Sequence, residues 1–168
     1  MIISIIISII KIKKEVLMNK IICVFLGLSV FIASGEVKKA NYDEIKNSIS
    51  VLENAIKEGK EDLIPLFSEA IEIEKRANTP YYAEKIMKKI CKAGKIKEDE
   101  FINLRKNFSF FDISIAWTIN QITGKPIEKI LKDKEEKGWI DVICQENIFQ
   151  KENVLLKIKE LNPKSETF

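Results

Sequence analysis

The stretch that decides the fold is 110–143, which reads FFDISIAWTINQITGKPIEKILKDKEEKGWIDVI. Its first part carries apolar residues at helical spacing and ends at Gly124, where a helix C-terminus favours a residue that tolerates a left-handed conformation. Pro126 suits the first turn of a second helix, because no backbone N–H donor is needed there. Gly138 then allows a reversal, and Trp139 opens a third, short segment. The stretch predicts helices hinged at glycine and proline.

The apolar positions of this stretch predict a structural wedge at the centre of the fold. On the first helix, a small residue at Ala116 lets a neighbouring helix approach, and Trp117 lies on the same face. We expect Trp139 to cover the gap between the first two helices, where a buried Trp contributes ~3 kcal/mol or more. The predicted buried face comprises Ile113, Ala116, Trp117, Ile119, Asn120 and Thr123, followed by Ile127, Ile130 and Leu131. The predicted wedge residues are Trp117, Gly124, Pro126, Ile130, Leu131, Gly138 and Trp139.

Three short motifs in this stretch carry a resemblance. They are Thr123-Gly124-Lys125, Ile130-Leu131 and Lys137-Gly138-Trp139. The pattern resembles that of small exported bacterial helical proteins of unknown function, and it covers roughly the last third of the chain. The resemblance implies a helical exported module and implies no activity.

Further helices are predicted on both sides of the stretch. Upstream, the pattern predicts helices over 42–58, 61–77, 80–94 and 98–106; downstream, it predicts one over 139–145 and one over 150–161. The first has the clearest apolar stripe, which we expect to face the core: Tyr42, Ile45, Ile49, Leu52 and Ile56. Thr79 is expected to cap the third helix and Gly94 to stop it. No alternating run long enough for a strand occurs. We therefore predict an all-α, single-domain bundle of about six to eight short helices over 36–163, with a polar tail at 164–168.

The first 35 residues indicate export. A short basic start at Met18 precedes a 12-residue apolar run, 21–32, and small residues follow at Ala33, Ser34 and Gly35. This is typical of a secretory signal that begins at Met18 and is cleaved after Gly35, with 1–17 as an upstream extension. The alternative is a retained anchor, although 12 residues are short beside the ~20 needed to span a membrane. We expect a periplasmic or secreted protein with no stable transmembrane anchor after processing.

The charge balance argues against a nucleic-acid partner. The whole chain has 28 basic and 25 acidic residues, and its first 35 residues hold four and one of these, which leaves 24 of each sign. A neutral domain lacks the positive field that nucleic-acid binding requires. A cytoplasmic helix-turn-helix protein that reads DNA with the 126–143 hairpin remains the alternative, because of the short-helix, glycine, short-helix rhythm.

The sequence offers few groups for catalysis. It contains no histidine, which removes Ser-His and Cys-His catalysis and the common zinc sites. Carboxylate groups such as Glu69 with Glu72, or 98–100, are expected on solvated faces, and Glu74 is expected with them as a surface partner for lysines. After processing, Cys91 and Cys144 either form one disulfide or stay separate buried thiols. We therefore predict no catalytic, cofactor-binding or metal residues.

These observations predict a non-enzymatic protein that works by contact with an unidentified protein or envelope component. Its site is expected in a groove beside the turn region 124–139.

Overall fold

The computed structural model describes residues 36–148 and 153–162, and within them every regular element is a helix. The elements are α2 (Tyr42–Lys57), the 3₁₀ turn η1 (Glu61–Leu63), α3 (Ile64–Arg76), α4 (Pro80–Gly94), α5 (Glu98–Asn107), α6 (Phe110–Thr123), α7 (Ile127–Lys137), α8 (Trp139–Gln145) and α9 (Val154–Leu161). The chain divides into two units, Met1–Glu36 and Val37–Phe168, and these helices all belong to the second. The all-α class is confirmed for this part of the chain. The expected export segment and the tail 164–168 lie outside the described residues.

Helix α6 is buried on every side. It packs against α3, α4, α7 and α9, and its residues 110–119 are all buried except Asp112, which is half-buried. The burial therefore extends beyond the predicted stripe to Ile115, Ser114 and Thr118 on the other faces. Two of these are polar, and their hydroxyls donate to backbone carbonyls one turn earlier: Ser114 to Phe111 at 2.9 Å and Thr118 to Ser114 at 2.8 Å. The buried hydroxyls are thus satisfied within the helix.

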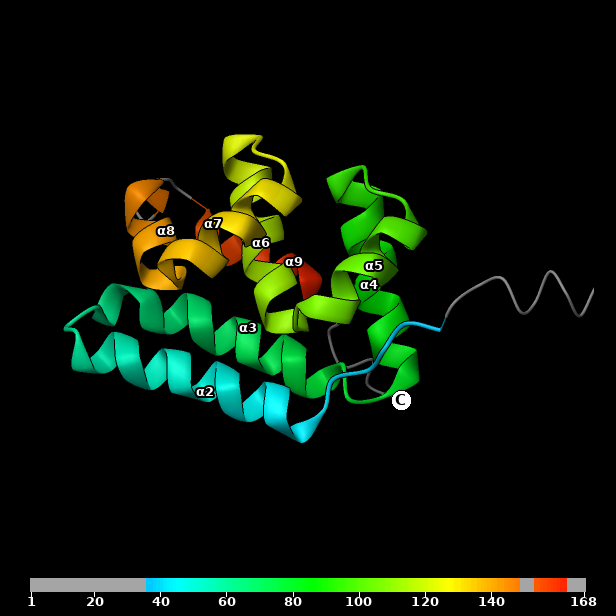
Figure 1. Cartoon of the computed structure of the whole chain (residues 1–168), viewed down its shortest axis with the longest axis horizontal. Coiled ribbons are helices and arrows are strands. Elements are labelled where there is room, and N and C mark those ends of the chain that lie inside the picture. Colours follow the sequence, from blue (N-terminus) through cyan, green and yellow to red (C-terminus); the bar gives the residue numbers. More distant parts are fainter. Residues whose placement is uncertain (1–35, 149–152, 163–168) are drawn as a thin grey trace, which may run out of the picture. The chain divides into compact units, whose positions relative to one another are not determined.

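Helix α2 begins with a capping box. The Asn41 side chain accepts from the Glu44 backbone N–H at 2.9 Å, and the Glu44 carboxylate accepts from the Asn41 N–H at 3.0 Å. The helix ends before Gly59, whose φ of 66° is left-handed. Figure 1 shows α2 running beside α3, which is its main packing partner. Since α3 also packs against α6 and α9, it lies between α2 and the rest of the bundle.

The apolar stripe of α2 does not face the core as predicted. The fully buried residues of this helix are Ser48 and Ala55, whereas Tyr42, Ile49 and Ile56 are 78%, 39% and 50% exposed. The other two residues of the stripe, Ile45 and Leu52, are half-buried. The core contact is rotated toward small residues because Ser48 and Ala55 let α3 approach closely. One edge of the apolar stripe therefore stays in solvent.

The end of α4 also differs from the sequence prediction. Thr79 caps the start of the helix, and its hydroxyl accepts from the Tyr82 N–H at 3.4 Å. At the other end, the left-handed residue is Lys95, with φ 55°, and Gly94 is still helical. Gly94 has a packing reason instead: a Cβ there would lie 3.4 Å from side-chain atoms of both Trp117 and Ile127. The missing side chain lets α4 approach α6 and α7.

Candidate functional site

The structure gathers the predicted wedge residues around the junctions of α6, α7 and α8. Gly124 caps α6 with φ 74°, and Gly138 separates α7 from α8 with φ 83°. Pro126 is the residue before α7 and has ψ 137°, so it does not sit in the first helical turn as predicted. The apolar members are buried: Trp117, Ile130, Leu131 and Trp139. These side chains form part of one continuous core, so their role is packing.

Trp139 has a polar anchor as well as a packing role. It is 3% exposed, and its indole N–H donates to the Asp112 carboxylate at 2.7 Å. Asp112 also completes the capping box of α6 with Ser109, and the Lys134 ammonium lies 3.1 Å from it. One carboxylate therefore links the start of α6 to α7 and α8.

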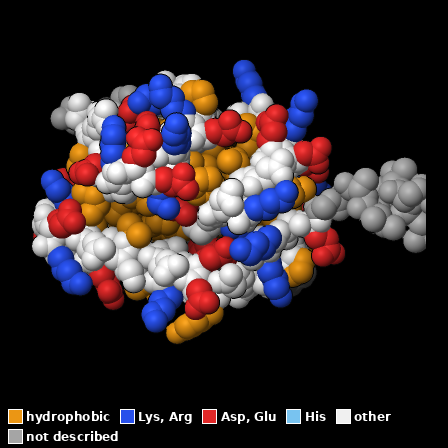
Figure 2. Space-filling view, in the orientation of Figure 1, with side chains coloured by type: hydrophobic (Ala, Val, Ile, Leu, Met, Phe, Trp, Pro, Cys, Tyr) orange, Lys and Arg blue, Asp and Glu red, His pale blue; other side chains and the backbone are white. Residues whose placement is uncertain are grey.

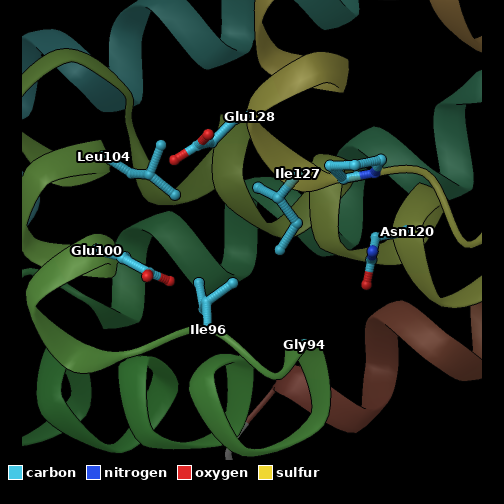
Figure 3. A pocket seen from close by; sticks show the side chains of 8 residues that line it. Gly94, Ile96, Glu100, Leu104, Asn120, Ile127 and Glu128 are labelled. Carbon is cyan, nitrogen blue, oxygen red and sulfur yellow. The ribbon is translucent and has the colours of Figure 1, made fainter.

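A cavity of about 290 Å³ opens where two turns meet, the α4–α5 turn and the α6–α7 turn. Its lining residues are Gly94, Ile96, Glu100, Leu104, Asn120, Pro126, Ile127 and Glu128. In Figure 3, the carboxylates of Glu100 and Glu128 lie on the same side of the cavity as Leu104, and Asn120 lies on the other side. The cavity adjoins the first part of the predicted groove region, 124–139, and its other wall comes from α5, which the sequence did not indicate.

Hydrogen bonds fix the frame of this cavity. The Asn120 amide donates to the Lys125 carbonyl at 2.7 Å, and its oxygen accepts from the Gln121 amide at 3.0 Å. Gln121 also donates to the Ala93 carbonyl at 3.2 Å, which ties the end of α6 to the end of α4. Lys125 in turn forms an ion pair with Glu146. The two turns are thus held together before any ligand binds, which lowers the entropy cost of binding.

An unsatisfied donor lies next to the cavity. The Trp117 indole nitrogen is buried and has no hydrogen-bond partner among the described residues. The edge of the indole that carries this nitrogen faces Gly94, because a Cβ on that glycine would lie 3.4 Å from Cδ1 and 3.7 Å from Nε1. Buried donors without partners are uncommon in native structures.

The lining combines apolar walls with negative charge at the opening. Ile96, Leu104 and Ile127 supply the apolar surface, while Glu100 and Glu128 are exposed carboxylates. Glu100 accepts the Lys97 backbone N–H at 3.1 Å, which holds its carboxyl group in place. The volume lies just below the usual range for ligand pockets, ~300–1,000 Å³. Such a site suits a small group with an apolar stem and a cationic head.

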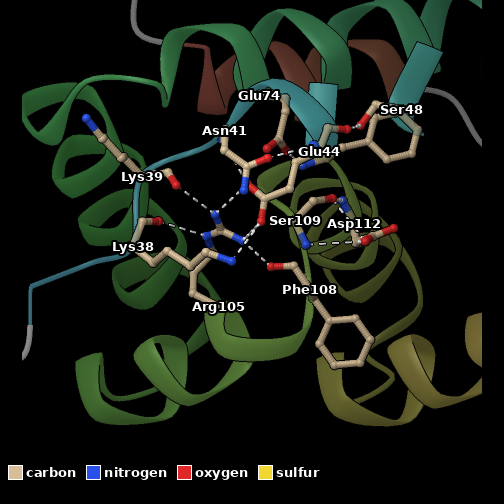
Figure 4. A network of polar contacts seen from close by, with 11 residues as sticks. Lys38, Lys39, Asn41, Glu44, Ser48, Glu74, Arg105, Phe108, Ser109 and Asp112 are labelled. Carbon is tan, nitrogen blue, oxygen red and sulfur yellow. Dashed lines mark hydrogen bonds and ion pairs between the residues drawn. The ribbon is translucent and has the colours of Figure 1, made fainter. Parts of the chain in front are cut away.

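A second polar cluster, around Arg105, is structural (Figure 4). Arg105 is 1% exposed and lies over the Phe110 ring, with 4.4 Å between its Cζ atom and the ring centroid. Its Nε donates to the Lys38 carbonyl at 3.1 Å, and its Nη atoms donate to the carbonyls of Lys39 and Phe108 and to both Glu44 carboxylate oxygens. All five N–H donors are therefore used, and none is left for a ligand. The cluster holds the chain that leads into α2 against α5.

Two carboxyl groups near this cluster have pKa values that are shifted in opposite directions, one by burial and one mainly by Arg105. Burial alone raises the pKa of Glu44. The hydrogen bonds and charge of Arg105, together with hydrogen bonds from Asn41 and Lys38, outweigh burial, so this pKa lies below its ordinary value. Glu74 is fully buried, and burial raises its pKa to about 7, although the Phe111 backbone N–H donates to it and Arg105 is near. Its second oxygen has no partner among the described residues. The prediction that Glu74 lies on the surface is wrong.

Sequence reasoning missed Glu74 because its neighbours on α3 are exposed or paired acids. Glu72 pairs with Lys75 at 2.9 Å, and Glu69 lies 3.7 Å from Lys159. A helical projection places Glu74 beside the buried Ile71 and Ile73, which was the available signal. The carboxyl group is accommodated there because the Phe111 backbone N–H at the start of α6 donates to it.

The two cysteines of this unit are free thiols. Cys91 is half-buried and Cys144 is exposed, so neither the disulfide nor the alternative of two buried thiols describes the structure. Burial and the charges of Glu98 and Glu100 raise the pKa of Cys91 to about 11. The Cys91 thiol is therefore protonated near neutral pH and is a weak nucleophile.

Three further observations concern metal binding, membrane spanning and surface charge. Among the described residues, no group of three or more His, Cys, Asp or Glu side chains is arranged to hold a metal ion. In the same part of the chain, no helix has the length and hydropathy needed to cross a membrane. Figure 2 shows that the face it displays carries Lys and Arg side chains interspersed with Asp and Glu.

The fold and the cavity describe a small helical protein with a preformed, acidic-rimmed pocket. No known protein family, curated protein or solved structure matches the chain.

Proposed function

We propose that this protein is an exported, non-enzymatic binding protein of the periplasm or the cell exterior. It acts by contact, through the cavity beside Pro126, and the bound group has an apolar stem and a cationic head. The observation that carries the proposal is that Glu100 and Glu128, from two different helices, line the same partly apolar cavity. An ammonium group at the opening lies near both carboxylates while its stem contacts Leu104 and Ile127.

The cationic preference follows from the lining itself. Two carboxylates and no ammonium or guanidinium group line the cavity. Exposed charge pairs contribute only about 0.2–1 kcal/mol each, so the affinity depends on the apolar walls and the selectivity on the charges. A lysine side chain of a partner protein has this chemistry, as does a free alkylamine. Binding of either is weak, because the cavity is small.

A titration with n-hexylammonium tests the cavity. Backbone amide resonances of Ile96, Leu104 and Ile127 should shift with n-hexylammonium and much less with hexanoate. Replacing both rim carboxylates, Glu100→Gln with Glu128→Gln, should weaken binding about fivefold, the effect of roughly 1 kcal/mol. The matched control is Glu135→Gln, an exposed acid on α7 that does not line the cavity. Equal shifts with hexanoate, or undiminished binding to the double variant, would contradict the assignment.

Cell fractionation with intact-mass measurement tests the export half of the proposal. The mature chain should start at Glu36 and be recovered outside the cytoplasm, because 18–35 has the features of a cleaved signal. An unprocessed chain in the cytosol would overturn it.

The alternative DNA-binding function has little support in the 126–143 hairpin. The exposed residues of α8 are Asp141, Cys144 and Gln145, and none is a cation. A recognition helix needs positive charge near phosphates, and α8 offers an acidic residue instead.

A further inference from the structure

The apolar edge of α2 is a surface that the fold leaves in solvent. Tyr42, Ile49 and Ile56 are 78%, 39% and 50% exposed. Ile45 and Leu52, which lie beside them on the helix, are half-buried and connect this edge to the core. Figure 1 shows α2 at the border of the helical unit, with α3 as its neighbour. A residue set of this kind is larger than the single exposed apolar side chains common on protein surfaces.

The spacing of the three exposed residues is regular. They recur every seven residues, which is close to two helical turns, so they form one line along α2 with steps of ~10.5 Å. Ile49 is the midpoint, because Tyr42 and Ile56 lie seven residues on either side. A two-fold axis through Ile49 therefore places Tyr42 of one helix opposite Ile56 of another, twice, and Ile49 opposite itself.

The charges beside this line favour the same arrangement. Lys46 and Glu53 are both exposed and lie along the outer edge of the apolar line. Neither forms an ion pair within the described part of the chain. When two copies of α2 run antiparallel about Ile49, Lys46 of each faces Glu53 of the other. In a parallel pair, the Lys46–Glu53 edges of the two copies would lie on opposite sides of the contact, so neither charge would meet its partner.

We propose that α2 is a self-association surface, on which a second copy of this chain packs antiparallel about Ile49. The apolar line supplies the contact, and two Lys46–Glu53 pairs set the direction. The interface is isologous, so it closes with two copies and does not propagate. The line of three side chains falls well below the ~800 Å² per partner of a standard interface, so the dimer is weak and forms reversibly.

Sedimentation velocity of the full chain over a concentration series tests the proposal. The weight-average sedimentation coefficient should rise with concentration. Ile49→Glu should raise the dissociation constant at least tenfold, because it buries two carboxylates against each other at the axis. The matched control is Leu156→Glu, which places the same charge on another exposed apolar residue, 61% exposed and on α9. Circular dichroism should show that both variants keep their helical content.

Charge-reversal variants test the antiparallel direction of the two α2 helices independently. Lys46→Glu and Glu53→Lys should each weaken self-association by about fivefold. The chain that carries both exchanges should regain the original affinity, since each pair is restored with reversed polarity. A simple loss of apolar contact cannot produce this recovery.

Two outcomes would overturn the proposal. In the first, association is unchanged by Ile49→Glu, which would assign it to another part of the chain. In the second, the chain is monomeric at all concentrations. Protection of Ile49 from hydroxyl-radical labelling would then assign the α2 edge to a segment of the same chain.

Discussion

Helices α6 and α2 both carry an apolar face in sequence, but the two faces are covered to very different extents in the fold. Helix α6 is enclosed by α3, α4, α7 and α9, whereas α2 rests on α3 and leaves one edge of its stripe in solvent. By sequence alone, α2 has the cleaner amphipathic period. The comparison teaches that an apolar period shows which face avoids water and leaves open which element covers that face. A core contact and an interface with another molecule have the same pattern.

The largest expected effect comes from removing a large buried side chain of α6. Trp117→Ala should lower the free energy of unfolding by about 4 kcal/mol, because it leaves a large cavity between α4, α6 and α7. Urea unfolding at a concentration where the chain is monomeric measures the change. The matched substitution on α2, Ile49→Ala, should cost less than about 0.5 kcal/mol under the same conditions. Similar losses for the two variants would mean that the α2 edge is buried in the monomer.

A smaller effect is the pH dependence of stability that we expect from the buried Glu74. Glu74 supports the start of α6, and its pKa of about 7 is higher than the ordinary value near 4.5 that applies in the unfolded chain. The folded state therefore holds this proton more tightly, and stability should fall as pH rises from about 4.5 to about 7, then level off. The total loss should be on the order of 3 kcal/mol. Urea unfolding across this pH range measures it.

Glu74→Gln should remove this contribution to the pH dependence, because the amide still accepts from the Phe111 N–H but does not ionise. The control is Glu72→Gln, an exposed acid on the same helix, which should leave the slope nearly unchanged. A slope that persists in the Glu74 variant would assign the pH dependence to other groups.

Much of the local structure could be predicted from residue types. Gly124 and Gly138 have the left-handed conformations that mark helix ends, and Thr79 caps α4. These features depend on interactions within a few residues, so the sequence around them carries the information. The prediction failed at Gly94. The local sequence suggested that this glycine ends the helix, whereas the structure shows that a side chain at this position would crowd Trp117 on another helix.

The candidate cavity could be predicted only in part. The turn region after Gly124 drew attention through its glycine and proline, and Pro126, Ile127 and Glu128 do line the cavity. Its other wall, with Glu100 and Leu104, comes from α5, and nothing in that segment marks it as different from any acidic first turn. The pairing of Glu100 with Glu128 arises from the way two distant turns meet.

The amino-acid sequence by itself determined the helical class, the positions of most helix ends and the apolar identity of α6, because these follow from propensity, capping and composition over short distances. Only the tertiary structure decided that Glu74 and Arg105 are buried, that Cys91 and Cys144 stay apart, and that one edge of α2 remains uncovered. Each of these depends on which faces of distant helices pack together, and the apolar period of a single helix is compatible with several such packings.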